Sequence, residues 1–307
     1  MSRYIFQRVL AMFLVIWVVI TATFFLMRAI PGGPFDTEKR IPESILRNIQ
    51  ARYRLDQPLW RQYVEYLGRV AVWDLGPSYK QEGRTVNDII NDGFPVSATL
   101  GGLSLALALL IGLPAGIISA LRQNRWQDYA AMFTSIVLVS VPNFILAALL
   151  MYVFALKLRW VPPALWGKPS QAVLPTIALS GFSLAFVARL TRSSMLEVIQ
   201  QDYVRTARSK GLSEMAVIYR HMIKNALAPV IAYLGPLAAA VLTGSFVVEM
   251  IFGIPGLGRY YVTSISNRDY TVVLGTTVFF GILLVVLVFI GDLLTAFIDP
   301  RIRLEKE

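Results

Sequence analysis

The chain has 307 residues, of which 56% are hydrophobic and 16% are charged, and its formal net charge is +10. A soluble domain carries about 25% charged residues, so this composition indicates a membrane protein, in which excess lysine and arginine set topology rather than bind nucleic acid. The absence of cysteine excludes disulfides, thiolate metal sites and a cysteine nucleophile.

The first apolar stretch, near residues 9–28, follows a basic flank formed by Arg3 and Arg8. The stretch is longer than a signal-peptide core, and no small-x-small cleavage site precedes the polar turn at 31–34. We therefore expect an uncleaved first membrane helix. The segment that follows, 29–95, carries nine basic and nine acidic residues. Its apolar residues recur near helical spacing, which predicts short amphipathic helices.

Six apolar stretches are long enough to cross a bilayer as helices. They lie near residues 9–28, 96–121, 129–156, 172–190, 229–252 and 272–297. With the N-terminus inside, the inner segments carry about 14 lysines and arginines against five in the short outer loops. This bias predicts cytoplasmic termini and an external 29–95 segment. Gly112 and Gly116, in the second stretch, predict a close approach to another helix.

The sequence lacks the residue patterns of the common catalytic sites. It has neither a Gly-x-x-x-x-Gly-Lys-Ser/Thr phosphate loop nor a His-Glu-x-x-His zinc motif, and its single histidine, His221, cannot form a multi-histidine metal site. Glu249 and Asp292 fall near the ends of apolar stretches, where a structural role is favoured over a proton or ion relay. The glycines at 253–258 predict a tight outer turn between two spans.

A polar segment, Thr191–Pro229, separates the fourth and fifth apolar stretches and is too long for a tight connection. The charge bias places it in the cytoplasm. We expect a helix over 203–210 that is capped by Gly211, and then a second helix with Ser213 as its N-cap. Such a segment is expected to expose Ala207 and Gly211, small enough to enter a groove on another protein. A basic loop held by anionic lipid explains the composition equally well.

The sequence Tyr203–Gly211 resembles the coupling motif of ABC importer permeases, in the variant of the peptide and nickel type. The general motif is Glu-Ala-Ala, three residues and then glycine. This chain has Arg205-Thr206-Ala207, with Gly211 at the matching offset. The proline that follows the motif comes later than in the general pattern, at Pro229, as it does in the peptide-type permeases.

Other stretches also resemble this family, and they cover nearly the whole chain. They lie at 31–35, 55–58, 74–78, 94–98, 188–192, 253–258 and 299–303. The likeness is greatest to the B-type subunit of oligopeptide permeases, although dipeptide, glutathione and nickel permeases share these signatures.

The resemblance implies an all-α integral membrane protein with about six transmembrane helices and the type I ABC importer permease fold. It implies an N-terminal helix and extracytoplasmic segment (1–95), a transmembrane domain (96–298) with a coupling region at about 191–228, and a cytoplasmic tail (299–307). The residues that it implies for docking to an ATPase are Arg205, Thr206, Ala207 and Gly211, flanked by Arg208 and Lys210. The expected external contacts are Gly253, Pro255, Gly256 and Gly258.

The resemblance also implies a non-catalytic subunit in a bacterial or archaeal cytoplasmic membrane. Its implied partners are a homologous C-type permease subunit in a heterodimer, two ABC ATPases, an extracytoplasmic substrate-binding protein and membrane lipid, without nucleic acid. The chain itself is expected to bind no cofactor or metal, because ATP and magnesium bind to the ATPases. The implied cargo is oligopeptide. The alternatives are dipeptides, glutathione-like peptides or nickel on the same machinery, and a stand-alone proton-coupled carrier.

Overall fold

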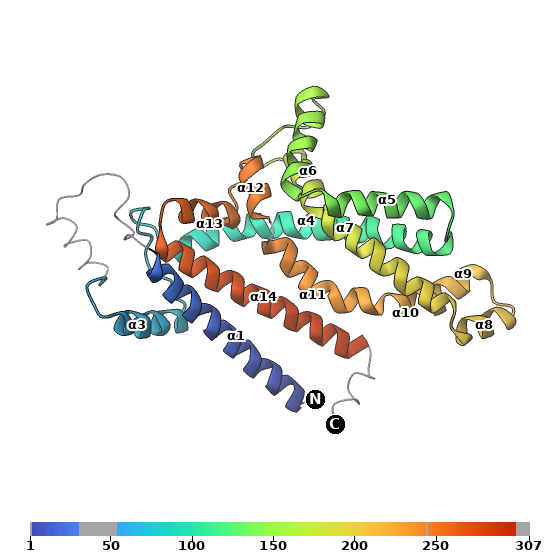
Figure 1. The fold of residues 1–307 in the computed structure, drawn as a ribbon, viewed down its shortest axis with the longest axis horizontal. Helices are drawn as coiled ribbons and strands as arrows, with labels where there is room; N and C mark the ends of the chain where they lie inside the picture. Colours follow the sequence, from blue (N-terminus) through green and yellow to red (C-terminus); the bar gives the residue numbers. More distant parts are fainter. Residues whose placement is uncertain (1, 31–53, 244, 299–307) are drawn as a thin grey trace. The chain divides into compact units, whose positions relative to one another are not determined.

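A computed structural model describes residues 2–30, 54–243 and 245–298 of the chain (Figure 1). Regular structure in these ranges is helical, apart from one isolated antiparallel bridge between Pro77 and Thr85. The expected all-α fold class is therefore confirmed.

The helices differ widely in length. They are α1 (Ser2–Ala29), α3 (Leu59–Ala71), α4 (Val86–Leu121), α5 (Trp126–Ser140), α6 (Asn143–Leu150), α7 (Pro169–Ile199), α8 (Asp202–Ser209), α9 (Glu214–Ala216), α10 (Lys224–Ala226), α11 (Ala228–Thr243), α12 (Phe246–Phe252), α13 (Leu257–Ser266) and α14 (Tyr270–Ile298). Two π-helical segments continue this series. They are η1 (Met151–Lys157), which extends α6, and η2 (Val217–Ile223), which joins α9 to α10.

Five helical segments are long and apolar enough to cross a membrane. They are Phe6–Ala29, Val86–Leu121, Pro169–Ile199, Ala228–Phe252 and Tyr270–Thr295. The sixth expected span, near 129–156, is wrong as a single helix, because α5 and α6–η1 are bent by 105° against each other. The bend lies where Pro142 lacks a backbone N–H and forces the preceding residue into an extended conformation. Val141 accordingly has φ −92° and ψ 117°.

The described chain divides into two compact units. The first comprises 1–95 and 256–285, and the second comprises 96–255 and 286–307. Residues 256–285 thus belong to the same unit as the N-terminal residues. The division into 1–95 and 96–298 expected from the sequence did not predict this association.

In the first unit, α3 packs on α1, and a loop at 74–85 is anchored to the start of α14. Phe24 of α1 lies with its ring centroid 5.4 Å from that of Tyr63 in α3. The carboxylate of Asp269 accepts hydrogen bonds from the Ser78 hydroxyl and from the backbone N–H of Tyr79, the latter at 3.1 Å. Gly275 lets α14 approach the start of α4, because a Cβ there would lie 2.6 Å from the Val86 side chain.

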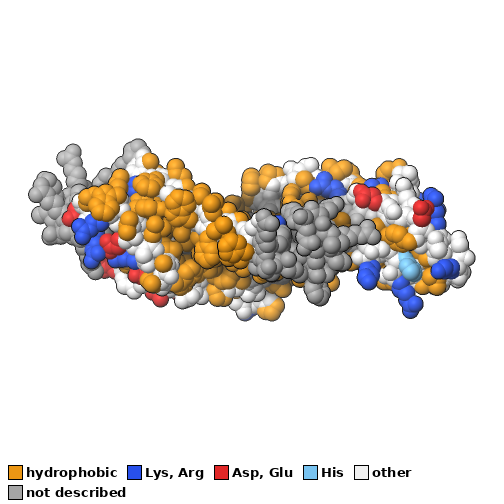
Figure 2. Space-filling view, turned by 90° about the horizontal axis from the view of Figure 1, so that it is seen from below, with side chains coloured by type: hydrophobic (Ala, Val, Ile, Leu, Met, Phe, Trp, Pro, Cys, Tyr) orange, Lys and Arg blue, Asp and Glu red, His pale blue; other side chains and the backbone are white. Residues whose placement is uncertain are grey.

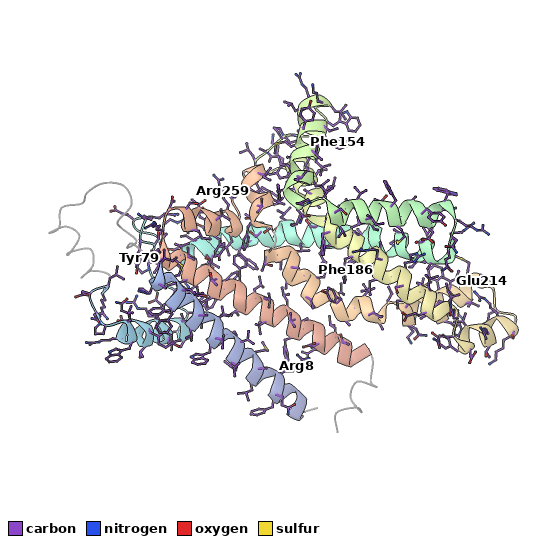
Figure 3. All side chains as sticks on the ribbon, viewed as in Figure 1. Arg8, Tyr79, Phe154, Phe186, Glu214 and Arg259 are labelled. Atoms are coloured by element: carbon purple, nitrogen blue, oxygen red, sulfur yellow. The ribbon has the colours of Figure 1, made fainter. Side chains whose placement is uncertain are left out.

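In the second unit, α7 packs against α5, α6 and α11. Phe186 of α7 and Tyr233 of α11 have ring centroids 4.5 Å apart (Figure 3). The predicted close approach of α4 to another helix is confirmed. A Cβ on Gly112 would lie 2.9 Å from a backbone carbonyl oxygen of α7, and a Cβ on Gly116 would lie 2.5 Å from another.

Glu249 is fully buried in the second unit and joins α12 to α4. Its carboxylate accepts hydrogen bonds from the hydroxyls of Ser97, at 2.7 Å, and Ser245, at 2.6 Å. This geometry satisfies a buried polar group within the protein and agrees with the structural role favoured for Glu249.

Candidate coupling site

The segment that follows α7 forms two helices separated by a glycine, as expected. The membrane helix α7 continues beyond the apolar stretch to Ile199, α8 follows directly, and α9, η2 and α10 form the second helical stretch (Figure 1). We refer to Asp202–Ala226 as the α8–α10 segment. It lies entirely within the second unit.

The turn between α8 and α9 is fixed by its own residues. Gly211 adopts φ +76°, in the left-handed region that favours glycine, and its N–H donates to the carbonyl of Arg208 at 2.9 Å. Ser213 then caps the next helix, because its hydroxyl accepts the N–H of Ala216 at 3.4 Å. The predicted C-cap and N-cap are both confirmed.

The inner face of the α8–α10 segment is apolar and packs on the ends of α4 and α7. Its buried residues are Val204, Ala207, Val217, Met222 and Ala226, clustered with Ala120, Met195 and Val198. The expectation that Ala207 is exposed is therefore wrong. The helical phase of α8 turns Ala207 inward, where it is only 4% exposed, and its small side chain allows close packing rather than entry into a partner.

The outer face of the segment carries charged and apolar side chains together. Arg205, Thr206, Lys210 and Gly211 are all exposed, and the expected exposure of Gly211 is thus confirmed. Large apolar residues that the sequence analysis did not single out are also exposed. They are Leu212, Met215 and Tyr219, at 39%, 61% and 63%. Figure 2 shows basic side chains and the pale blue histidine gathered on the surface of this segment.

Arg208 forms the closest ion pair of the segment, whereas Arg205 makes only a longer one with Asp202, at 3.7 Å. The Arg208 guanidinium donates twice to the Glu214 carboxylate, at 3.2 Å and 2.6 Å, and so closes the turn around Gly211 (Figure 3 labels Glu214). The hydrogen bond from Arg208 lowers the pKa of Glu214. Within the described residues, Lys210 makes no ion pair. Arg208 is thus committed to the turn, whereas Lys210 remains available to a partner.

A buried ion pair braces the helices that carry this segment. Asp128 of α5 is 3% exposed and accepts two hydrogen bonds from the guanidinium of Arg192 in α7, at 2.7 Å and 2.8 Å. The same carboxylate accepts the Ser119 hydroxyl of α4 and, at 3.0 Å, the N–H of Asn124. One side chain therefore ties α4, α5 and α7 together next to the α8–α10 segment.

The second set of expected contacts, the glycine-rich turn, has a different form from the one predicted. Gly253 ends α12 with φ +63°, but α13 intervenes before the next membrane helix, so the turn does not join two spans directly. Pro255 is exposed, whereas Gly256 and Gly258 are buried. Only the exposed part of the turn is open to a direct external contact.

The sequence of the chain matches two models of known protein families. Residues 112–304 match the model of the binding-protein-dependent transport system inner membrane component. Residues 1–101 match the corresponding N-terminal model. The chain belongs to this family. It is accordingly a multi-pass permease subunit of an ABC transporter, and the family is non-catalytic.

The permease resembles curated relatives over its whole length. It is 49% identical over 307 residues to the dipeptide transport system permease protein DppB of Bacillus subtilis, and covers 100% of both chains. It is 44% identical over 305 residues to the oligopeptide transport system permease protein OppB of Salmonella typhimurium, covering 99% of this chain and 100% of the relative.

Solved structures support the type I permease fold. An inward-facing structure of the MetNI methionine ABC transporter matches with TM-score 0.55 and 18% identity, over 69% of the permease and 96% of that chain. A crystal structure of an amino acid ABC transporter with histidines matches with TM-score 0.52 and 19% identity, over 70% and 94%. At this identity the likeness concerns the fold alone.

Proposed function

We propose that the permease is one half of the membrane pore of an ATP-driven importer and translocates oligopeptides delivered by a binding protein. The names of the relatives support peptide cargo, with dipeptides as the nearest alternative. The other half of the pore is a homologous C-type subunit, and two ATPases bind ATP and magnesium. This chain binds neither. The orientation has the termini and the α8–α10 segment in the cytoplasm, as the distribution of lysine and arginine favours.

The observation that carries the proposal is the two-sided character of the α8–α10 segment. Its inner face is packed against residues of α4 and α7, while its outer face offers exposed Met215, Tyr219 and Lys210. Aromatic and methionine side chains are enriched at protein interfaces, where they supply apolar contact area. A displacement imposed on the outer face by an ATPase is transmitted to the membrane helices through the inner face, so ATP hydrolysis drives alternating access.

The proposal also assigns contacts to the binding protein that delivers the cargo. The segment from Arg54 to Thr85 and the exposed Pro255 turn contact the binding protein, and peptide selection resides in that protein. A peptide of varied sequence requires a roomy passage rather than a tight pocket, because the contacts cannot depend on particular side chains.

Substitution of Met215 by aspartate tests the docking role. The side chain is 61% exposed, so the variant folds, but the charge is unfavourable in an apolar interface. We expect Met215→Asp to lose co-purification of the ATPases and peptide-stimulated ATP hydrolysis in proteoliposomes. Val72→Asp is the matched control for co-purification of the ATPases alone, because Val72 is also exposed, at 75%, but lies after α3 in the segment assigned to the binding protein. Normal assembly and uptake with Met215→Asp would contradict the proposal, as would transport in liposomes that lack the ATPases.

A further inference from the structure

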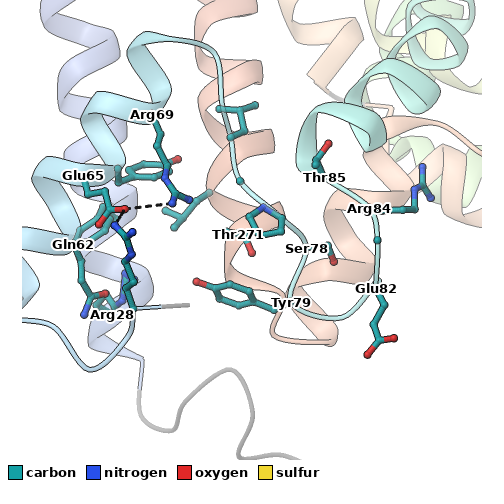
Figure 4. Close-up of a pocket in the computed structure, with 18 residues that line it drawn as sticks. Arg28, Gln62, Glu65, Arg69, Ser78, Tyr79, Glu82, Arg84, Thr85 and Thr271 are labelled. Atoms are coloured by element: carbon teal, nitrogen blue, oxygen red, sulfur yellow. Dashed lines mark hydrogen bonds and ion pairs between the residues drawn. The ribbon is translucent and has the colours of Figure 1, made fainter. Parts of the chain in front are cut away.

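The first unit contains a cavity lined largely by the segment from Arg54 to Thr85. It has a volume of about 680 Å³ and lies between α1, α3, the 74–85 loop and α14 (Figure 4). This volume falls within the range of about 300–1,000 Å³ that is typical of small-ligand sites. The wall contributed by Phe24, Leu75 and Leu274 is apolar, and the remainder is largely polar or charged.

Three buried polar atoms in the cavity lining have no hydrogen-bond partner among the described residues. They are one terminal nitrogen of the Arg28 guanidinium, the Tyr66 hydroxyl and the Gln62 side-chain oxygen. Burial raises the pKa of Tyr66, so its phenol retains its proton and is a donor. An unpaired buried donor is costly and is rare in native structures. These atoms therefore indicate a ligand.

The three atoms specify the chemistry of that ligand. Arg28 and Tyr66 offer donors and require an acceptor. The Gln62 amide nitrogen donates to the carbonyls of Leu55, at 3.2 Å, and Gln57, at 2.7 Å, which orients the amide and leaves its oxygen as an acceptor for a ligand hydroxyl. The complementary group is an oxyanion that also carries a hydroxyl.

The charges around the cavity favour the same class of ligand. Its lining includes four arginines and two glutamates. Glu65 is shared by Arg54, at 2.5 Å, and Arg69, at 3.3 Å, so this group retains a net positive charge. A zwitterionic peptide would need a free buried carboxylate for its ammonium group, but Glu65 is already engaged and the other lining glutamate, Glu82, is exposed. Guanidinium groups bind phosphate well, through several donors in a fixed plane.

The position of the cavity indicates which kind of molecule carries the phosphate group. Arg28 is the penultimate residue of the apolar span Phe6–Ala29, so the cavity borders the membrane interface. Beside it, Phe25 and Leu26 of α1 are exposed, at 45% and 67%. We propose that this cavity binds the phosphate and glycerol hydroxyls of an anionic phosphatidylglycerol headgroup, with the acyl chains along α1.

Lipid retention by the purified chain tests the proposal. In nanodiscs of mixed phosphatidylglycerol and phosphatidylcholine with the same acyl chains, native mass spectrometry should show phosphatidylglycerol retained selectively. Arg28→Gln and Tyr66→Phe should each weaken retention. The effect of Arg28→Gln should be about tenfold or more, because the variant loses a hydrogen bond between charged groups. Arg61→Gln is the control, because Arg61 is an exposed basic residue of α3 outside the lining, and it should change retention less than twofold.

Stability without anionic lipid provides a second readout. The two cavity variants should then melt no lower than the unchanged protein, because each removes a buried group that has no partner. A lower melting temperature with no dependence on lipid would show that these groups are satisfied within the chain, and would overturn the proposal. Equal retention in all variants would do the same. Displacement of the lipid by millimolar inorganic phosphate would instead assign the site to free phosphate, and displacement by a dipeptide would assign it to cargo.

Discussion

The left-handed turn at Gly211 allows the coupling proposal to be tested by backbone conformation alone. Gly211 has φ +76°, and a Cβ built on it would meet no atom within 4 Å. A substitution there therefore strains the backbone without a steric clash. The left-handed region costs a residue with a Cβ about 1–2 kcal/mol, and up to about 3 kcal/mol when the residue is poorly suited to it. Asparagine tolerates this region better than most residues.

The expected order of activity is thus Gly211, then Gly211→Asn, Gly211→Ala and Gly211→Val. Each 1.4 kcal/mol corresponds to a factor of about ten in an equilibrium, so Gly211→Ala should weaken ATPase docking about tenfold, and Gly211→Val should abolish coupled transport. The measurements are ATPase affinity and peptide-stimulated hydrolysis in the reconstituted complex. Membrane insertion should be unchanged, because the turn lies outside the apolar spans.

Ser209→Val separates backbone strain from added bulk. Ser209 is exposed on the same surface but lies within α8, so valine there costs only about 0.5 kcal/mol of helix propensity. If Ser209→Val and Gly211→Asn are both nearly normal while Gly211→Val is inactive, the turn conformation is the required feature. Equal activity of Gly211→Val and the unchanged permease would refute the reasoning.

Three further predictions concern the frame of the second unit. Because Glu214 has a lowered folded pKa, its pair with Arg208 stabilises the turn above the ordinary pKa of 4.5 and is lost as the pH falls through the lowered value. After correction for the intrinsic pH dependence of amide exchange, the protection of the amides at 209–213 should fall in acid, and Glu214→Gln should remove this fall; an identical protection profile in that variant would contradict the prediction. Asp128→Ala should cost about 3 kcal/mol of unfolding free energy, since it leaves a guanidinium without its partner in a largely buried pair, and an unchanged melting temperature would argue against the brace. Gly235→Ala should cost about 1–3 kcal/mol, because its Cβ would lie 2.4 Å from a carbonyl of α14, whereas Gly102→Ala, with open space around it, should be nearly neutral.

Much of the architecture could be predicted because its signals are local in the sequence. Long apolar runs predicted most of the spans, and the order of polar residue, glycine and serine predicted the two caps around Gly211. The break at Pro142 was also local, but hydropathy alone does not distinguish it from the proline that α7 accommodates within its helix at Pro175. That difference depends on whether neighbouring helices satisfy the freed backbone groups.

The parts that were missed depend on direction and on distant partners. A helix of eight residues such as α8 has too few apolar positions to predict which of its faces is buried, and therefore whether Ala207 faces inward. The brace between Asp128 and Arg192 joins residues 64 positions apart, and a single sequence contains no periodic signal for such a pair. The pairing of Arg208 with Glu214 is likewise not predicted, because a basic residue near a docking motif is equally consistent with a contact to a partner.

The α8–α10 segment contains residues that hold its conformation and residues that lie exposed on its outer face. Ala207 and Arg208 belong to the first group, through burial and through the ion pair that closes the turn. Met215, Tyr219 and Lys210 belong to the second, because they remain exposed. A segment that transmits force must satisfy both requirements, since a flexible turn would absorb a displacement instead of passing it to α4 and α7. The proposed coupling therefore requires the apolar inner face and the left-handed glycine, even though neither needs to touch an ATPase.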